Sequence, residues 1–288
     1  MKETTKFDRK KENVGNVLNM EHINLTVPDQ QLAAVFYVSG LGFTRDPYVD
    51  LALSNMWVNT GEQQIHLPKN TAQKWRGHIA VVVPKLEELK KRFNRIEKLM
   101  DQTQFAWEEQ EDHFRVTCPW GNDIRVYGPN KFPGRYLGIP YAEMLVAPNT
   151  SEGIARFYEN VLGTKATIID NDEGKRAEVS MGFDQRLVYM ESDSEIAEYD
   201  GHHIAIYIAD FSRPYNYLRE RGLITEETNQ HQYRFQEIVD PENGETMTEL
   251  EHEVRSLKHP MYNRKLVNRN SEQTLSDYTN GQDAFYPG

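Results

Sequence analysis

One pattern recurs four times along the chain, and it constrains the fold more than any other feature. Each copy contains a short apolar strand, a turn at proline or aspartate, and an amphipathic helix. The copies begin at Glu21, Gly77, Tyr141 and His202. Such a repeat predicts one supersecondary unit per copy, in which each unit buries its apolar face against another unit.

Strand-like runs joined by short turns follow each predicted helix. The second copy ends in HFRVTCPWGNDIRVYG and the fourth in RFQEIVDPENGETMTELEHEV, and both place a turn with proline and glycine between two alternating runs. This pattern indicates a hairpin, so each unit is predicted to be β-α-β-β-β. The short turns exclude a doubly wound parallel sheet. We therefore expect an α+β fold of four βαβββ units, paired into two domains.

The expected organisation has four parts. Residues 1–18 are polar and are predicted to be a flexible N-terminal arm, residues 19–130 form the first pair of units, and residues 137–253 form the second. Residues 254–288 lack helical or strand periodicity. Because this tail contains Pro260, Met261, Tyr262 and Leu266, we expect it to pack on the body of the protein.

The charge balance excludes several classes of partner. The 288 residues include 44 acidic and 33 basic side chains, which gives a net charge of −11. A nucleic acid or an anionic membrane surface would require a basic footprint. One cysteine, Cys118, excludes an intrachain disulfide. The N-terminus lacks the apolar core of a signal peptide, and no apolar run could span a bilayer, so a cytoplasmic protein is expected.

Four segments carry a resemblance to a known family. They are FYVSGLGF at 36–43, GHIAVVVP at 77–84, FYENVLG at 157–163 and DPENGETMTEL at 240–250. Over about residues 20–252 the chain resembles the vicinal oxygen chelate superfamily, which includes glyoxalase I, bleomycin-resistance proteins and type I extradiol dioxygenases. The resemblance implies that each pair of units curls into a mixed-sheet cup with helices outside. It also implies that metal ligands come from the first and last strands of each unit.

In the first predicted cup, this resemblance places three histidines in ligand positions. They are His22 and His78 on the opening strands and His66 on a last strand. Arg125 occupies the fourth position, where it could bind a substrate carboxylate with two hydrogen bonds. The alternative is that the histidines are strand-end residues with ordinary hydrogen-bond partners.

In the second predicted cup, one histidine and two carboxylates form the preferred ligand set. His203 matches His78 through the shared HIA, and strand parity favours Glu143. Glu249 is preferred over Glu251 on the last strand, although the register of the preceding turn leaves both open. We expect this cup to be the active one, since only it offers carboxylates as well as an imidazole.

Three further residues are candidates for proton transfer. His252 and His259 lie close to the tail, and histidine titrates near neutral pH. Tyr189 lies on a strand, where a tyrosine is more often a core residue.

Three hypotheses for function stay open at this point. The first is a metal-dependent, extradiol-like ring-cleaving dioxygenase for a small aromatic substrate, with Fe(II) as the preferred cofactor and Mn, Ni or Zn as alternatives. The second is a glyoxalase-like isomerase or lyase, and the third is a metal-free protein that binds a small molecule. A homo-oligomer is possible in each case.

Overall fold

Four β-α-β-β-β units make up the computed structural model, which describes residues 7–49, 54–182, 184–270, 273 and 275–285. The first unit contains β1 (Val17–Asn24), α1 (Gln30–Ala33), β2 (Thr44–Arg45), β3 (Trp57–Thr60) and β4 (Gln63–His66). The second contains β5 (Gly77–Val82), α2 (Leu86–Ile96), β6 (Ala106–Glu109), β7 (His113–Thr117) and β8 (Asp123–Tyr127). The predicted unit is therefore confirmed in this half of the chain.

The other two units have the same order of elements. The third contains β9 (Tyr141–Val146), α3 (Ser151–Phe157), β10 (Ala166–Asn171), β11 (Gly174–Ser180) and β12 (Arg186–Glu191). The fourth contains β13 (His203–Ile208), α4 (Ser212–Glu220), β14 (Ile224–Asn229), β15 (Gln232–Val239) and β16 (Thr246–Ser256). Within the described residues, no helix is long and apolar enough to cross a membrane.

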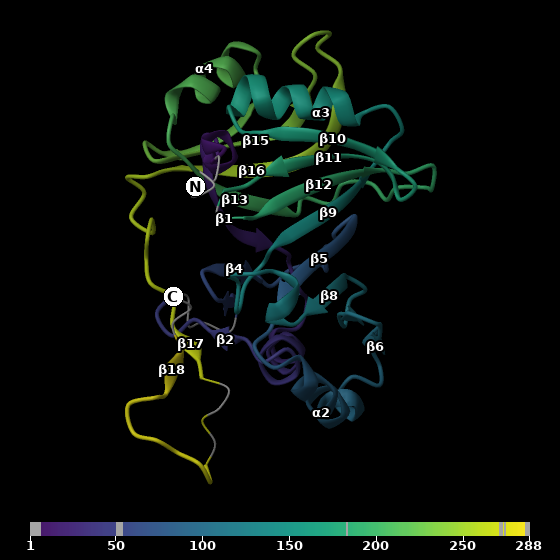
Figure 1. Ribbon diagram of the computed structural model, residues 1–288, viewed down its shortest axis with the longest axis vertical. Coiled ribbons are helices and arrows are strands. Elements are labelled where there is room, and N and C mark those ends of the chain that lie inside the picture. The colour runs from purple at the N-terminus through teal and green to yellow at the C-terminus, as the bar shows by residue number, and fades with distance from the viewer. Residues whose placement is uncertain (1–6, 50–53, 183, 271–272, 274, 286–288) are drawn as a thin grey trace, which may run out of the picture.

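The units pair into two eight-stranded mixed sheets, but consecutive units do not pair. Sheet one has the order β14-β15-β16-β13-β1-β4-β3-β2, which joins the first unit to the fourth. Sheet two has the order β10-β11-β12-β9-β5-β8-β7-β6, which joins the second unit to the third (Figure 1). The expected pairs 19–130 and 137–253 therefore do not each form a sheet. All four opening strands have a similar apolar pattern, so the sequence does not indicate which of them lie side by side.

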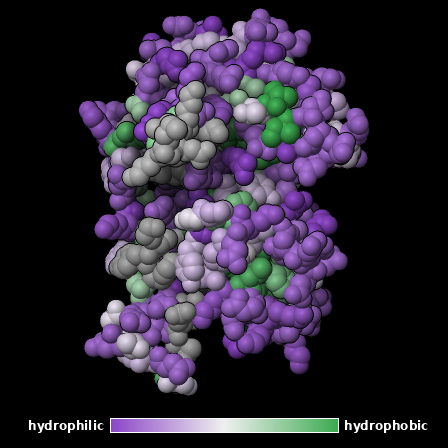
Figure 2. All heavy atoms as spheres, viewed as in Figure 1, coloured by the Kyte–Doolittle hydropathy of each residue, from purple (hydrophilic) through white to green (hydrophobic). Residues whose placement is uncertain are grey.

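The apolar core lies between the two sheets. Helix α3 contacts strands of both sheets, and apolar residues from all four units form one buried cluster. On the face shown in Figure 2, hydrophobic side chains appear only in small separate patches. Because one face of each sheet packs on this core, alternate residues on the opposite face are free to carry polar groups.

The described segments near both ends of the chain are tied to the body more closely than their composition suggests. The side-chain amide of Asn16 donates to the carbonyl oxygen of Leu162 at 2.8 Å. Because β1 already begins at Val17, the predicted arm ends before residue 18. At the other end β16 continues to Ser256, so the tail begins after Val254. It then passes along one side of the molecule to a short ribbon of β17 (Asn268–Arg269) and β18 (Ala284–Phe285) (Figure 1).

The tail segment 257–269 makes specific contacts with the first unit. The Asn268 side-chain amide donates to the Gly61 carbonyl oxygen at 2.9 Å, and the Asn59 side chain donates to the Val267 carbonyl oxygen at 2.8 Å. Arg264 forms an ion pair of 2.9 Å with the buried Asp46. These contacts carry the tail across sheet one from β16 to β3.

A substitution at Gly182 tests how closely strand β1, near the N-terminus, packs against this glycine. Its φ is +72°, and a Cβ there would lie 2.1 Å from the carbonyl oxygen of Leu18. Gly222 has a similar φ of +70°, but a Cβ there meets nothing within 4 Å. We expect Gly182→Ala to lower the free energy of unfolding by several kcal/mol, and Gly222→Ala by only about 1 kcal/mol. Equal losses in chemical denaturation would contradict the close approach of Leu18.

Candidate metal centre

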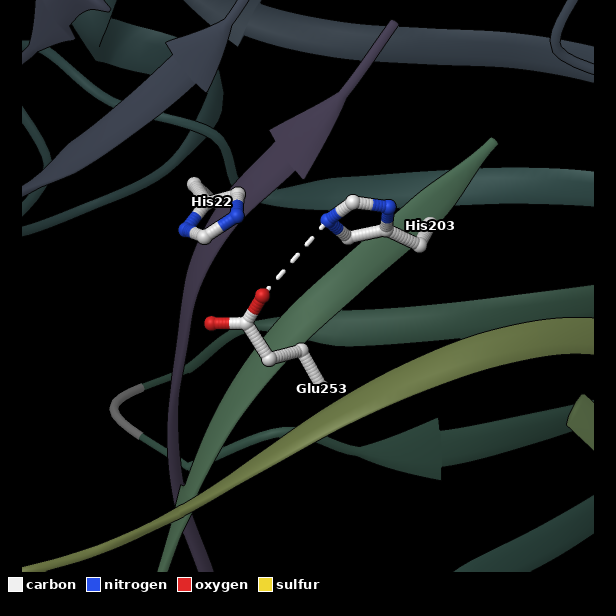
Figure 3. A group of neighbouring side chains, drawn as sticks. All are labelled: His22, His203 and Glu253. Atoms are coloured by element: carbon white, nitrogen blue, oxygen red, sulfur yellow. Dashed lines mark ion pairs between the residues drawn. The ribbon is translucent and has the colours of Figure 1, made fainter. Parts of the chain in front are cut away.

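Two histidines and one glutamate converge on the polar face of sheet one. They are His22 on β1, His203 on β13 and Glu253 on β16, and one ligand atom from each lies within 4.8 Å of the others (Figure 3). All three side chains are buried. Within the part of the chain that the structure describes, this is the only group of three or more potential metal ligands at such distances.

The strand register explains why these residues meet. Ala205 on β13 lies opposite both His22 on β1 and Glu253 on β16, and His203 lies opposite Asn24 on β1. Residues directly opposite each other share a face of the sheet, as do residues two positions apart on one strand. The three ligands therefore come from three adjacent strands and point to the same side.

Each imidazole has a carboxylate on its Nδ1 side. His22 Nδ1 donates to Glu21 Oε2 at 2.5 Å, and His203 Nδ1 lies 3.4 Å from Glu251 Oε1. The Nε2 atoms of His22 and His203 are buried and have no hydrogen-bond partner among the described residues. A carboxylate on one ring nitrogen and a free lone pair on the other is the usual environment of a histidine that binds a metal.

Two arginines fix the carboxylate of Glu253. Arg255 Nε donates to Oε1 at 2.6 Å, and Arg234 Nη2 donates to Oε2 at 2.5 Å. Arg255 also bridges to Glu21 at 3.0 Å. The Nε2 atom of His203 lies 3.7 Å from Glu253 Oε2, which is the pair marked in Figure 3. A carboxylate oxygen has more than one acceptor site, so these hydrogen bonds orient Glu253 and leave capacity to bind a cation.

The protonation states favour binding of a cation. Burial, with the electrostatic influence of the nearby His22 and Arg234, lowers the pKa of His203 well below its usual value. Burial alone would raise the pKa of Glu21, but His22 and Arg255 lower it to about 2. Near neutral pH His203 is thus a neutral imidazole and Glu21 an anion. A metal binds histidine in its neutral form, so no proton needs to leave His203 first.

These residues fit a divalent transition metal. Two imidazole nitrogens and one carboxylate on one face form the donor set typical of mononuclear iron sites, and imidazole also suits Zn, Ni and Mn to different degrees. The buried Nε2 atoms without partners are the observation that indicates a missing ligand.

His66 lies beside this centre rather than in it. Its ring stacks on Trp57 with a centroid distance of 3.7 Å and meets His22 edge-on at 5.7 Å. Its Nε2 is 2.9 Å from Asn55 Oδ1. Burial, with the electrostatic influence of the nearby His22, lowers the pKa of His66 to about 2.

The structure separates the other residues of the two predicted ligand sets from this centre. His78 and Glu143 lie opposite each other on β5 and β9 of sheet two, with His78 Nδ1 3.2 Å from Glu143 Oε1. Arg125 lies on β8 of the same sheet, where the neighbouring Tyr141 and Glu143 raise its pKa against the effect of burial. Each predicted set combines residues of both sheets, because the prediction pairs consecutive units.

Glu249 is on the predicted strand, but it lies too far from the other ligands along that strand. Its Oε1 accepts a hydrogen bond from Gln236 at 2.7 Å, and it lies four positions before Glu253 on β16. Sequence reasoning considered Glu249 and Glu251 and missed Glu253. A period of two places Glu251 and Glu253 on one face, but an irregularity in the pairing of β15 and β16 between Glu249 and His252 changes the register, and the sequence does not indicate it.

His252 and Tyr189 lie in the core instead of on the polar face of sheet one. The hydroxyl of Tyr158 is 2.7 Å from His252 Nε2 and 2.6 Å from the hydroxyl of Tyr189. The His252 ring stacks on Phe235, and its Nδ1 donates to the Leu250 carbonyl oxygen. All of these side chains are fully buried between the sheets. This position does not allow either residue to contact a substrate at the candidate metal centre.

His259 lies on the tail, close to the polar face of sheet one. Its ring is 6.2 Å from that of Tyr207, whose hydroxyl is 3.4 Å from Arg255 Nη1. Partial burial and the charge of Arg255 lower the pKa of His259, so its neutral form can accept a proton near neutral pH.

The buried His252 predicts a loss of stability in acid. Burial lowers its pKa from 6.5 to about 4. The unfolded chain therefore takes up this proton first as the pH falls, and the free energy of unfolding decreases between about pH 6.5 and pH 4. We compare the free energy of unfolding at pH 7 and pH 5 by urea denaturation. Its decrease between these two pH values should be about 2 kcal/mol smaller in His252→Gln than in the wild type. Parallel pH dependences would contradict a buried, neutral His252.

Comparisons with known proteins agree with this fold. Residues 19–121 match the family model described as the Glyoxalase/Bleomycin resistance protein/Dioxygenase superfamily. No curated protein sequence matches the chain. Glyoxalase I from Zea mays shares 15% identity, with a TM-score of 0.58, over 87% of this chain and 95% of its own. A candidate dioxygenase from Bacillus subtilis subsp. subtilis str. 168 shares 15% identity, with a TM-score of 0.54, over 84% of this chain and 86% of its own.

At such identities the two structures show the fold alone. The family model covers the first unit and most of the second, and the fold similarity extends over all four units. Together they confirm the resemblance of this chain to the vicinal oxygen chelate superfamily.

Proposed function

We propose that the protein is a metal-dependent dioxygenase that acts on a small aromatic substrate at the polar face of sheet one. The observation that supports this proposal most is the ligand set of His22, His203 and Glu253. Two histidines and one carboxylate that leave other coordination positions open are typical of non-haem Fe(II) oxygenases. The ligand set expected from the sequence, with one histidine and two carboxylates, suited that chemistry less well.

The surrounding residues hold the ligands in place. Glu21 and Glu251 orient the rings of His22 and His203, while Arg234 and Arg255 orient Glu253. A bound divalent metal supplies Lewis-acid chemistry at substrate oxygens and, as Fe(II), a site for O₂. The chain's own contribution is a fixed geometry and a buried, low-dielectric site.

His259 is our candidate for proton transfer in this site. It is the one predicted acid–base residue that lies near the polar face of sheet one, and its neutral form can accept a proton. Arg125, proposed from the sequence as a substrate-binding residue, lies in sheet two and has no role in this proposal.

Metal content and oxygen consumption test the proposal together. We expect protein purified without chelators, or loaded anaerobically with Fe(II), to hold about one metal ion per chain and to consume O₂ with a catechol. Less than about a tenth of an equivalent of metal, with no activity after addition of Fe(II), Mn(II), Ni(II) or Zn(II), would favour a metal-free binding protein instead.

One observation supports a glyoxalase-like isomerase or lyase as a second candidate. Glu251 is only partly buried and lies beside His203, on the same face as the ligands. A carboxylate in that position could move a proton on a metal-bound substrate without any use of O₂. Metal binding without oxygen consumption would favour this candidate over the dioxygenase.

A further inference from the structure

One row of residues across the strands of sheet one lies beside the candidate metal ligands, and metal binding alone does not explain its buried polar groups. Reading across β3, β4, β1, β13 and β16, the row contains Trp57, His66, Asn24, His203 and Glu251. Neighbours in such a row share one face of the sheet. His203 belongs to the metal centre, so Trp57, His66 and Asn24 form a surface that leads directly to it.

Two polar groups of this row are buried without a partner. The Nε1 donor of Trp57 and the Oδ1 acceptor of Asn24 make no hydrogen bond with any described residue, although both side chains are more than nine-tenths buried. An unpaired buried donor or acceptor costs roughly 1–3 kcal/mol. Two of them on one face of the sheet, on either side of His66, indicate that a polar ligand completes them.

The arrangement of the row also indicates where a ligand enters. A second row across the same strands contains Asn59, Gln64 and His22. The tail covers this second row, because Arg264 contacts Gln64 Oε1 at 3.3 Å. On the row with Trp57, by contrast, His66 and Glu251 remain partly exposed. The side of His66 is therefore the more exposed side of the metal centre.

We propose that Trp57 and Asn24 are substrate-positioning residues, with the stacked Trp57 and His66 rings as the apolar wall of the subsite. Trp57 Nε1 donates a hydrogen bond to a hydroxyl oxygen of the ligand, and Asn24 Oδ1 accepts one from a hydroxyl group. A small planar ligand with hydroxyl groups satisfies both atoms and packs on the stacked rings, whose centroids are 3.7 Å apart. This inference rests on the proposed function only for the reaction that follows binding.

The test compares two probes that differ only in their hydroxyl groups. Calorimetric titrations with 4-chlorocatechol and chlorobenzene are run anaerobically on metal-free and Zn(II)-loaded protein. In Trp57→Phe and in Asn24→Leu, the affinity for 4-chlorocatechol should fall about 5- to 10-fold, which corresponds to one hydrogen bond. The affinity for chlorobenzene and the zinc content should stay as in the wild type. Trp107→Phe, on β6 of sheet two, is the matched control.

Each outcome of this test decides the proposal. Wild-type affinity for 4-chlorocatechol in both variants would overturn it, as would no binding of 4-chlorocatechol to the wild-type protein at millimolar concentration. An equal loss for both probes would show that the residues act through packing alone, which also overturns it. If binding of 4-chlorocatechol and its loss in the variants occur without any zinc uptake, the subsite stands and the metal-dependent function fails.

Discussion

Replacing Glu253 by alanine is expected to lower the affinity for divalent metal by at least about 100-fold. The substitution removes the one carboxylate of the ligand set, and even partners outside the ligand set typically contribute 10- to 100-fold. Glu249→Ala is the matched control, since it removes a carboxylate from the same strand, four residues away. Competition with a chromophoric chelator measures both affinities.

The same measurement of metal affinity shows which of the two sheets carries the metal ligands. His22→Ala and His203→Ala should weaken metal binding as severely as Glu253→Ala, whereas His78→Ala in sheet two should leave it unchanged. Metal loss in Glu249→Ala or His78→Ala, with retention in Glu253→Ala, would show that the ligands are those expected from the sequence.

Replacing Arg255 by methionine is expected to destabilise the metal-free protein by about 3–5 kcal/mol. The guanidinium is buried and pairs with Glu21 at 3.0 Å and with Glu253. Burial would lower the pKa of Arg255, but these two carboxylates raise it. Removal of one partner from a buried ion pair leaves an uncompensated charge, which has a cost of this size.

An exposed ion pair provides the control for this substitution. Lys90 and Glu109 are 2.9 Å apart, but each side chain is more than half exposed. Lys90→Met should therefore change the free energy of unfolding by less than about 1 kcal/mol. If Arg255→Met in the presence of a chelator is no more destabilising than Lys90→Met, the charged network around Glu253 does not contribute to stability in the way described.

The repeat made the architecture predictable. The strand–helix–strand pattern depends on local hydrophobic periodicity and on turn residues, and both are visible in the sequence near each element. The four copies starting at Glu21, Gly77, Tyr141 and His202 correspond to units that begin at β1, β5, β9 and β13. His22 and His203 could be identified for the same reason, since both lie on opening strands.

The pairing of the units and the register of β16 could not be predicted in the same way. Sheet pairing joins strands that are far apart in the chain, and any of the four apolar opening strands could pair with any other. As a result His22 was grouped with His78 when it lies next to His203. A one-residue change of register moves a side chain to the other face of a strand, and a two-residue change moves it along the face. Irregularities in the pairing of β15 and β16 shift that register, and the sequence does not indicate them, so Glu253 could not be predicted.

The position of a bound metal tests the central claim most directly. Crystals grown with Mn(II) or Fe(II) would give an anomalous difference map in which every metal peak is visible together with its ligands. We predict one strong peak among the side chains of His22, His203 and Glu253. A peak between His78 and Glu143, or no peak in crystals saturated with the metal, would contradict the assignment of the metal centre to sheet one.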